Sequence, residues 1–191
     1  DACGQKPAKA GVAVPTDPGY SGSTTPVTGD PPILSIGDQP EDAAGEVAVD
    51  WESIINGGIA PDYVVPPAVW SNIDFTDWPV VLVTDPSFDL PTEGGRGILI
   101  ATGDLTISGS ELWQGVVLVG GKLTSNGNNT VSGATISGLN VKLGMSVPMS
   151  DVGNGTKTFQ YNSCHIASAM QAFGGSLHIL ENTWLDNWAA Y

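Results

Sequence analysis

The chain has 191 residues, among them 25 Gly and 14 Pro, and a formal net charge of −14 because only six Lys and Arg oppose 20 Asp and Glu. This length accommodates one domain with a hydrophobic core, and so much Gly and Pro favours turn-rich β structure over long amphipathic helices. Such an acidic surface repels nucleic acid and anionic lipid headgroups, which excludes both as partners.

Residues 1–78 are expected to form an extended arm. The first 45 or so hold most of the Pro, Gly, Ser and Thr, a composition that buries too little apolar area to fold by itself. The apolar residues scattered through it are expected to pin it to another surface. They are Val12, Val14, Val27, Ile33, Leu34 and Ile36.

One short helix is predicted near residues 50–56 of this arm. Asp50 would be its N-cap and Asn56-Gly57 would end it. The following irregular stretch carries Tyr63, Trp70 and Trp78, which are expected to pack over the start of the next segment.

Residues 79–150 contain about four copies of an 18-residue unit. Gly97, Gly115 and Gly133 are 18 residues apart and each precedes an apolar cluster; one more step back reaches Pro79, which precedes another. A short fixed period with Gly at the corners is typical of a solenoid in which each copy makes one coil. The sequence therefore predicts an all-β fold, a short single-stranded parallel β-helix of about four 18-residue coils.

The side-chain pattern predicts which residues line the interior. The second and fourth residues of each copy, and then the ninth, are expected to form three interior columns. These columns are Val80, Ile98, Val116 and Ala134; Leu82, Ile100, Leu118 and Ile136; and Leu105, Leu123 and Val141. Leu99 and Val117 would then point outward on a largely apolar face that must be covered. The cover is either the chain's own arm and short helix or a partner protein, for which Leu99 and Val117 are the candidate contacts.

Cys3 and Cys164 lie near opposite ends of the chain. An even count in an acidic, turn-rich chain favours a disulfide and an oxidising, extracytoplasmic compartment. The alternative is a pair of free thiols, or Cys3 in a frayed terminus. The chain begins at Asp1, so we expect that any signal peptide or anchor helix lay upstream, and no apolar run approaches the ~20 residues of a membrane span.

Residues 151–191 are predicted to form a C-terminal cap and an aromatic tail. A short capping helix is expected at 165–173, ended by Gly174-Gly175. In the tail, Trp184, Trp188 and Tyr191 fall on one helical face. Such an aromatic face is expected to dock on the solenoid itself, on a partner, or at a membrane surface.

Two stretches, 97–106 and 115–124, share a pattern: Gly, three apolar residues, two variable ones, then Gly-Asp/Lys-Leu-Thr. Tyr161-Asn-Ser-Cys-His-Ile follows. Over about residues 75–173 the chain thereby resembles the C-terminal half of bacterial pilus-assembly (PilX-like) envelope proteins, and its repeat pattern is similar to that of bactofilins. The resemblance implies a secreted or envelope-anchored structural role without catalysis. The chain departs from that family by lacking the upstream anchor helix and by its tail beyond Gly175.

Motifs that carry chemistry are sparse. The cysteines and the two histidines, His165 and His178, lack zinc-site spacing, and there is no serine-nucleophile motif. We therefore expect no catalytic, cofactor-binding or metal-binding residues, although the sequence leaves open whether the acidic loops bind calcium. The function predicted is a non-catalytic structural or accessory subunit of an extracytoplasmic envelope assembly. The alternative is a carbohydrate-binding or carbohydrate-cleaving β-helix, which would use a carboxylate pair on one outward face.

Overall fold

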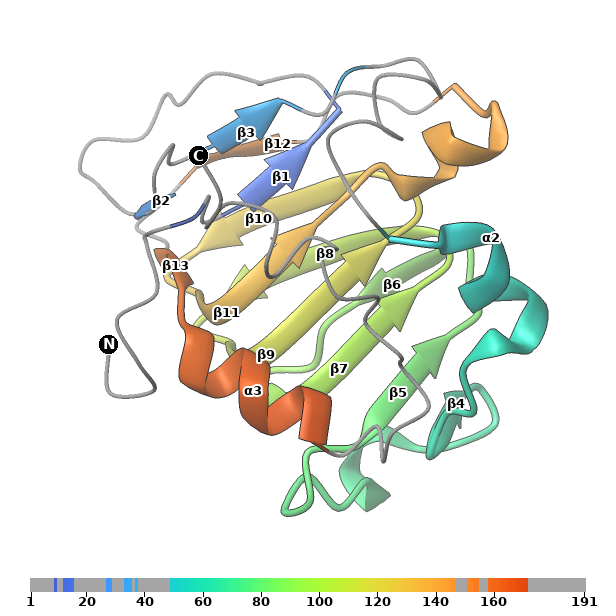
Figure 1. Ribbon diagram of the computed structural model, residues 1–191. Helices are drawn as coiled ribbons and strands as arrows, with labels where there is room; N and C mark the ends of the chain where they lie inside the picture. Colours follow the sequence, from blue (N-terminus) through green and yellow to red (C-terminus); the bar gives the residue numbers. More distant parts are fainter. Residues whose placement is uncertain are drawn as a thin grey trace.

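The computed structural model describes residues 9, 12–15, 27–28, 33–35, 37, 49–146, 151–154 and 158–171. These residues form a parallel β-solenoid of about five turns with a short C-terminal helix (Figure 1). The predicted fold class is therefore confirmed, with about one turn more than the glycine repeat indicated. The additional strands come from regions outside residues 79–150.

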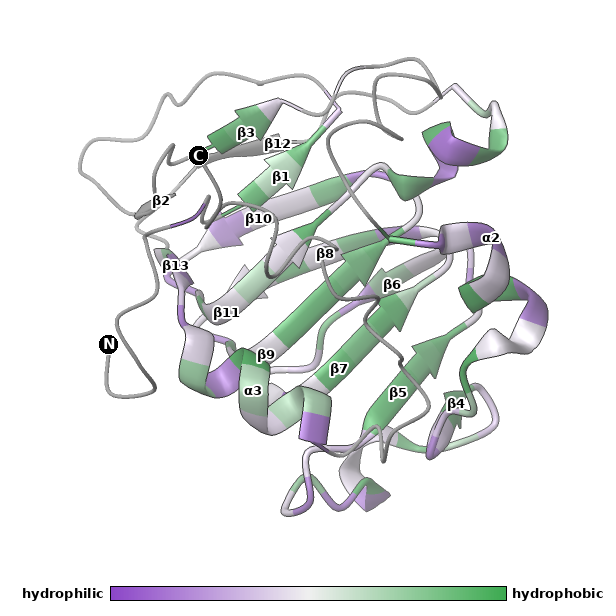
Figure 2. Ribbon diagram, in the orientation of Figure 1, coloured by the Kyte–Doolittle hydropathy of each residue, from purple (hydrophilic) through white to green (hydrophobic). Residues whose placement is uncertain are grey.

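Two parallel sheets make up the solenoid. Sheet A follows the order β2 (Val27–Thr28), β13 (Thr158–Tyr161), β11 (Thr130–Ile136), β9 (Leu112–Val119), β7 (Gly95–Ala101), β5 (Val80–Val83), β4 (Tyr63–Val65). Sheet B follows the order β12 (Asp151–Asn154), β10 (Leu123–Gly127), β8 (Asp104–Gly109), β6 (Ser87–Asp89). Figure 2 shows that the central strands of sheet A are predominantly hydrophobic.

The 18-residue repeat is the true stacking register of the central coils. Ile98 pairs with Val116 and Val116 with Ala134 in sheet A, and Leu105 pairs with Leu123 in sheet B. Ile100, Leu118 and Ile136 likewise form one column, as the sequence predicted.

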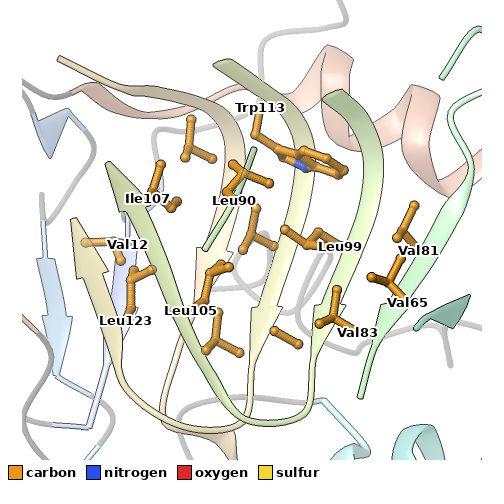
Figure 3. Packing of buried hydrophobic residues seen from close by; sticks show 14 of the residues in the cluster. Val12, Val65, Val81, Val83, Leu90, Leu99, Leu105, Ile107, Trp113 and Leu123 are labelled. Atoms are coloured by element: carbon orange, nitrogen blue, oxygen red, sulfur yellow. The ribbon is translucent and has the colours of Figure 1, made fainter. Parts of the chain in front are cut away.

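The predicted interior and exterior faces of sheet A are reversed. Leu99 and Val117 are fully buried between the sheets, where the interior cluster includes Leu105 and Leu123 of sheet B (Figure 3). Two of the three columns predicted to be interior lie instead on the outer face of sheet A. They are the columns of the second and fourth residues, and they form a second buried cluster that includes Val80, Ile98, Ile100, Val116, Leu118, Ala134 and Ile136. Leu105 and Leu123 of the third predicted column are interior, as expected. The prediction failed because both faces of these strands are apolar, so alternation carried no information about which face is inside.

The repeating glycines lie within strands rather than at corners. Gly97, Gly115 and Gly133 have φ angles of +113°, +125° and +152°, a region that residues with a side chain rarely adopt. A Cβ on Gly115 would collide with the carbonyl oxygen of Gly97, and one on Gly133 with that of Gly115. The glycine repeat therefore marks where the backbones of successive coils touch.

Aromatic residues close the N-terminal end of the solenoid. The Trp70 ring lies 5.4 Å from Phe75, 5.5 Å from Phe88 and 6.2 Å from Trp113, measured between ring centroids. Trp70 also donates a hydrogen bond of 3.0 Å from Nε1 to the carbonyl oxygen of Gly94. Packing of the irregular stretch over the start of the solenoid is thus confirmed for Trp70.

The N-terminal arm is not simply extended, because parts of it are strands of sheet A. β1 (Val12–Val14) pairs in parallel with β11 at Thr135 and Ile136 and with β3 (Ile33–Ser35), while β2 pairs with β13. The side chains of Val12 and Val14 belong to the interior cluster. The arm therefore closes the C-terminal end of the solenoid. Its predicted attachment to another surface of the chain is confirmed for the strands that contain Val12, Val14, Val27, Ile33 and Leu34. Ile36 lies outside the described residues.

Two helical elements cover the outer face of sheet A. The short helix is confirmed as α2 (Trp51–Ser53), where Asp50 accepts a capping hydrogen bond from Ser53 N, and a π-helical turn (Ile54–Gly58) extends it. α3 (Ser163–Gln171) contacts β7, β9 and β11 and crosses them in Figure 1. The helix predicted as an end cap thus lies on the outer face of sheet A, where it covers β7, β9 and β11. Shorter 3₁₀ helices span Trp70–Asn72 and Leu139–Leu143.

Candidate functional site

The residues predicted to bind a partner do not form a common surface. Leu99 and Val117 have no exposed area and are part of the interior, so they cannot be contact residues. Trp184, Trp188 and Tyr191 lie outside the described residues. The face of Leu99 and Val117, which was predicted to need a cover, packs against sheet B. The opposite face of sheet A is covered by the chain itself, through α3 and Trp51 of α2.

Cys164 lies in the first turn of α3 and does not carry a free thiol. Asn162 caps this helix, because its Oδ1 accepts hydrogen bonds of 3.0 Å from Cys164 N and 3.2 Å from His165 N. Cys3 lies outside the described residues, so the pairing of Cys3 with Cys164 stays a prediction.

A polar cluster lies where the N-terminal half of α3 meets sheet A. It consists of Trp78, Arg96, Gln114, Ser132 and His165, and we call it the outer-face cluster. Arg96, Gln114 and Ser132 occupy register-paired positions of β7, β9 and β11, each immediately before a repeating glycine. The cluster therefore combines a stacked polar row from three coils with an aromatic ring and an imidazole.

The contacts of the outer-face cluster centre on His165. Its Nδ1 lies 3.1 Å from the carbonyl oxygen of Ser132, and its Nε2 lies 3.5 Å from Gln114 Nε2. The ring of Trp78 lies 5.7 Å from the imidazole, and the Arg96 guanidinium carbon lies 5.4 Å from the centroid of the same indole. These contacts attach α3 to the sheet, and the chain's single arginine lies against the same indole that His165 contacts.

Arg96 is held from a second direction as well. Its Nε donates a hydrogen bond of 2.7 Å to the carbonyl oxygen of Phe75. Trp78 itself has a φ of +57°, an energetically costly conformation for a residue with a side chain. Hydrogen bonds from Thr76 lower the pKa of the Asp74 carboxyl, and the nearby charge of Arg96 lowers it further. The segment that carries Trp78 is thus fixed on both sides.

Tyr161 on β13 continues the column of repeating glycines, since it pairs with Gly133. Its hydroxyl is buried and has no hydrogen-bond partner, although the residue as a whole is half-buried. Burial raises the pKa of Tyr161 above its ordinary value of 10.0. In the 3₁₀ helix Leu139–Leu143, burial lowers the pKa of Lys142, and the Asp50 carboxylate partly offsets this effect.

The N-terminal end of the solenoid is strongly acidic. Residues 49–95 contain no Lys or Arg, whereas acidic residues recur in α2, before β4, in the aromatic cap and around β6. These residues are Asp50, Glu52, Asp62, Asp74, Asp77, Asp85, Asp89 and Glu93, of which all but Asp85 are exposed. We call the group from Asp62 to Glu93 the acidic end. Val69, with 58% of its area exposed, and the exposed Pro66 and Pro67 lie in the same segment.

Within the described ranges, no three or more His, Cys, Asp or Glu side chains come together in a way that could bind a metal ion. Nor does any helix there reach the length and apolarity that crossing a membrane requires.

Comparison with known proteins finds no matching family model, no similar curated protein and no similar solved structure. The resemblance to PilX-like envelope proteins and to bactofilins therefore stays a hypothesis that rests on the repeat pattern. Sequence reasoning missed the outer-face cluster, although a signal was present. The position before each repeating glycine is polar in three consecutive coils, which marks a row that is neither interior nor apolar cover.

Proposed function

We propose that this protein is a non-catalytic structural or accessory subunit of an extracytoplasmic bacterial envelope assembly, and that its acidic end docks on a basic surface of a partner protein. The solenoid supports a scaffolding role because its interior and the outer face of sheet A are both packed with apolar side chains. Such a body is suited to holding a surface in place rather than to changing shape.

The observation that carries the proposal is the segregation of charge. The acidic end contains six carboxylates, and residues 49–95 contain no Lys or Arg; the neighbouring Arg96, which contacts Phe75 and Trp78, offsets this charge only in part. Asp62 and Asp74 accept backbone hydrogen bonds of 2.7 and 2.8 Å, whereas Asp77 and Asp89 are exposed and make no such bond. Like charges held together in this way repel one another and attract a surface of opposite sign. Exposed Val69 provides an apolar contact within the same surface.

The aromatic tail is the second proposed attachment. Trp184, Trp188 and Tyr191 would anchor the chain to the assembly or to a membrane surface. Deletion of residues 176–191 tests this part separately, because it leaves the acidic end intact. The truncated protein is expected to leave the envelope fraction more easily than the full chain; equal retention of both forms would contradict the role of the tail.

Retention of the full chain in isolated envelopes at increasing NaCl concentration tests the acidic end. The double substitution Asp77→Asn and Asp89→Asn raises the net charge by two and should lower the salt concentration that releases the protein. The matched control, Ser108→Lys and Asn128→Lys, raises the net charge equally at exposed positions of other coils and should release like the wild type. If both double variants release at the same salt concentration, the acidic end does not dock.

Carbohydrate binding is the second candidate, and the outer-face cluster is the observation that favours it. A half-buried tryptophan beside the only arginine, next to a stacked polar row, offers ring stacking and charged hydrogen bonds to an acidic sugar. Binding of uronic-acid oligosaccharides that is lost in Trp78→Ala and Arg96→Ala, but not in Asp77→Asn, would support this candidate over the first.

A further inference from the structure

Three residues stack at the corner where sheet B passes into sheet A. Glu93, Glu111 and Asn129 are 18 residues apart, and each precedes a strand of sheet A by one or two positions. We call them the corner column. Glu93 is exposed, whereas Glu111 is only 2% exposed and Asn129 only 1% exposed.

Asn129 shows what the corner requires of a buried side chain. Its Nδ2 donates hydrogen bonds of 3.1 Å to the carbonyl oxygen of Ile107 and 3.0 Å to that of Asn126. Its Oδ1 accepts a hydrogen bond of 3.0 Å from Ser125 Oγ. The amide thus satisfies two carbonyl oxygens, so this position offers acceptors and needs a donor.

Glu111 occupies the same place one coil earlier with the opposite chemistry. The strand register makes Ser108 the equivalent of Asn126 and Ile107 the equivalent of Ser125. Extended by one residue, the register of β6 and β8 makes the carbonyl of Leu90 the equivalent of that of Ile107. An ionised carboxylate has no proton to donate to carbonyl oxygens. Consistent with this mismatch, Glu111 Oε2 is buried without a hydrogen-bond partner.

The Glu111 carboxylate is folded back against the backbone of its own corner. A Cβ placed on Gly109 would lie 3.1 Å from Oε1 and 3.4 Å from Oε2, so the carboxylate occupies the space that a side chain at Gly109 would fill. Within the described part of the chain, no Lys, Arg or His forms an ion pair with it. A buried carboxylate oxygen without a donor or a counter-charge is unfavourable.

We propose that the corner column binds a divalent cation, and that the cation is Ca²⁺. A bound cation would remove the mismatch, because the Glu111 carboxylate and the carbonyl oxygens of the corner are all suitable ligands for a hard metal ion. Glu93, one coil below at a strand spacing of about 4.8 Å, supplies a second carboxylate from the solvent side. Backbone carbonyls at a turn suit the irregular coordination of Ca²⁺ better than the strict octahedron of Mg²⁺.

This site shares Glu93 with the acidic end, but it depends on the buried carboxylate of Glu111 rather than on surface charge alone. Two of its proposed oxygen ligands are backbone carbonyls, so the site needs fewer than three acidic side chains. The sequence could have indicated it, because alignment of the 18-residue copies places Glu111 directly over the position of Asn129.

Calcium titration of the full chain by isothermal calorimetry, together with thermal unfolding in CaCl₂ and in EDTA at equal ionic strength, tests the proposal. The wild type should bind Ca²⁺, and its melting temperature should rise by several degrees with Ca²⁺ but not with Mg²⁺. Glu111→Gln carries the donor amide that Asn129 uses, so it should fold, remain at least as stable as the wild type in EDTA, and lose the response to Ca²⁺. Glu93→Gln should weaken the affinity, and Asp77→Asn, at the acidic end, should leave it unchanged.

Two results would overturn the site. The first is a wild-type melting temperature that is the same in CaCl₂ and EDTA. The second is a response to Ca²⁺ that survives in Glu111→Gln, which would place any bound ion elsewhere. Should Glu111→Gln fail to fold, Glu93→Gln takes its place in the test. Weaker Ca²⁺ binding in Glu93→Gln, with unchanged binding in Asp77→Asn, would support the site, and unchanged binding in both variants would overturn it.

Discussion

The indole nitrogen of Trp51 donates a hydrogen bond of 2.9 Å to Oδ1 of Asn140, which lies 89 residues further along the chain. Nδ2 of the same amide donates a hydrogen bond of 3.1 Å to the carbonyl oxygen of Thr102. One side chain therefore joins α2, the 3₁₀ helix after β11 and the corner of another coil. Trp51 is 1% exposed, so its N–H has no access to water as an alternative acceptor.

Replacement of Asn140 by alanine should lower the free energy of unfolding by about 2 kcal/mol, because it leaves the Trp51 N–H and the Thr102 carbonyl without a partner. Urea denaturation followed by tryptophan fluorescence measures this loss. Asn56→Ala is the control, since Asn56 is exposed and should change stability by no more than about 0.5 kcal/mol. Equal stability of the two variants would mean that Asn140 does not join these elements.

Gly115→Ala should destabilise the protein by about 3 kcal/mol or prevent folding. The new Cβ would collide with the carbonyl oxygen of Gly97 and lie 3.2 Å from the Cβ of Ala169 on α3. Gly57→Ala is the matched control, because Gly57 also has a positive φ, of +88°, but nothing lies within 4 Å of its Cβ position. That variant should lose only about 1 kcal/mol. Thermal unfolding that ranks the two variants in the reverse order would contradict the close approach of the coils.

The sequence predicted the period and the direction of stacking but not the side of the strand. Ile98 and Val116 differ little in hydrophobicity from Leu99 and Val117, because α3 and α2 make the outer face of sheet A as dry as the interior. The three-residue strand β1 shows the same limit. Val12–Val14 is too short to carry a pattern of its own, and its pairing with β11 depends on a contact between segments more than 100 residues apart.

The reversed faces can be tested by truncating one side chain of each. Leu99→Ala should cost about 3 kcal/mol, because Leu99 is fully buried between the two sheets. Leu82→Ala should cost about 1 kcal/mol, because Leu82 on the outer face is only half-buried. Chemical denaturation of both variants gives the two values. A larger loss for Leu82→Ala would restore the original prediction for the interior.

Tyr161→Phe should leave stability at neutral pH unchanged or raise it by up to about 1 kcal/mol, because the hydroxyl that it removes is buried without a partner. Above pH 10.0, the ordinary tyrosine pKa, the unfolded chain loses this proton while the folded chain keeps it. The stability of the wild type should therefore fall as the pH rises through that range, and more steeply than that of Tyr161→Phe. Unfolding curves between pH 8 and 11 would contradict this if the two proteins lose stability in parallel.

The 18-residue register underlies both the corner column and the outer-face cluster. Thr106 and Thr124 are register partners on neighbouring strands of sheet B, and both are half-buried. Neighbouring strands lie about 4.8 Å apart, within the range of Cα separations that a disulfide spans.

Peptide mapping of the oxidised double variant Thr106→Cys/Thr124→Cys is the most direct test of this register. The structure predicts a disulfide between residues 106 and 124, and much less cross-linking in Thr106→Cys/Asn126→Cys, where the second cysteine is two residues out of register. If the out-of-register pair cross-links as readily, or if the in-register pair does not cross-link, the coils do not stack at 18 residues.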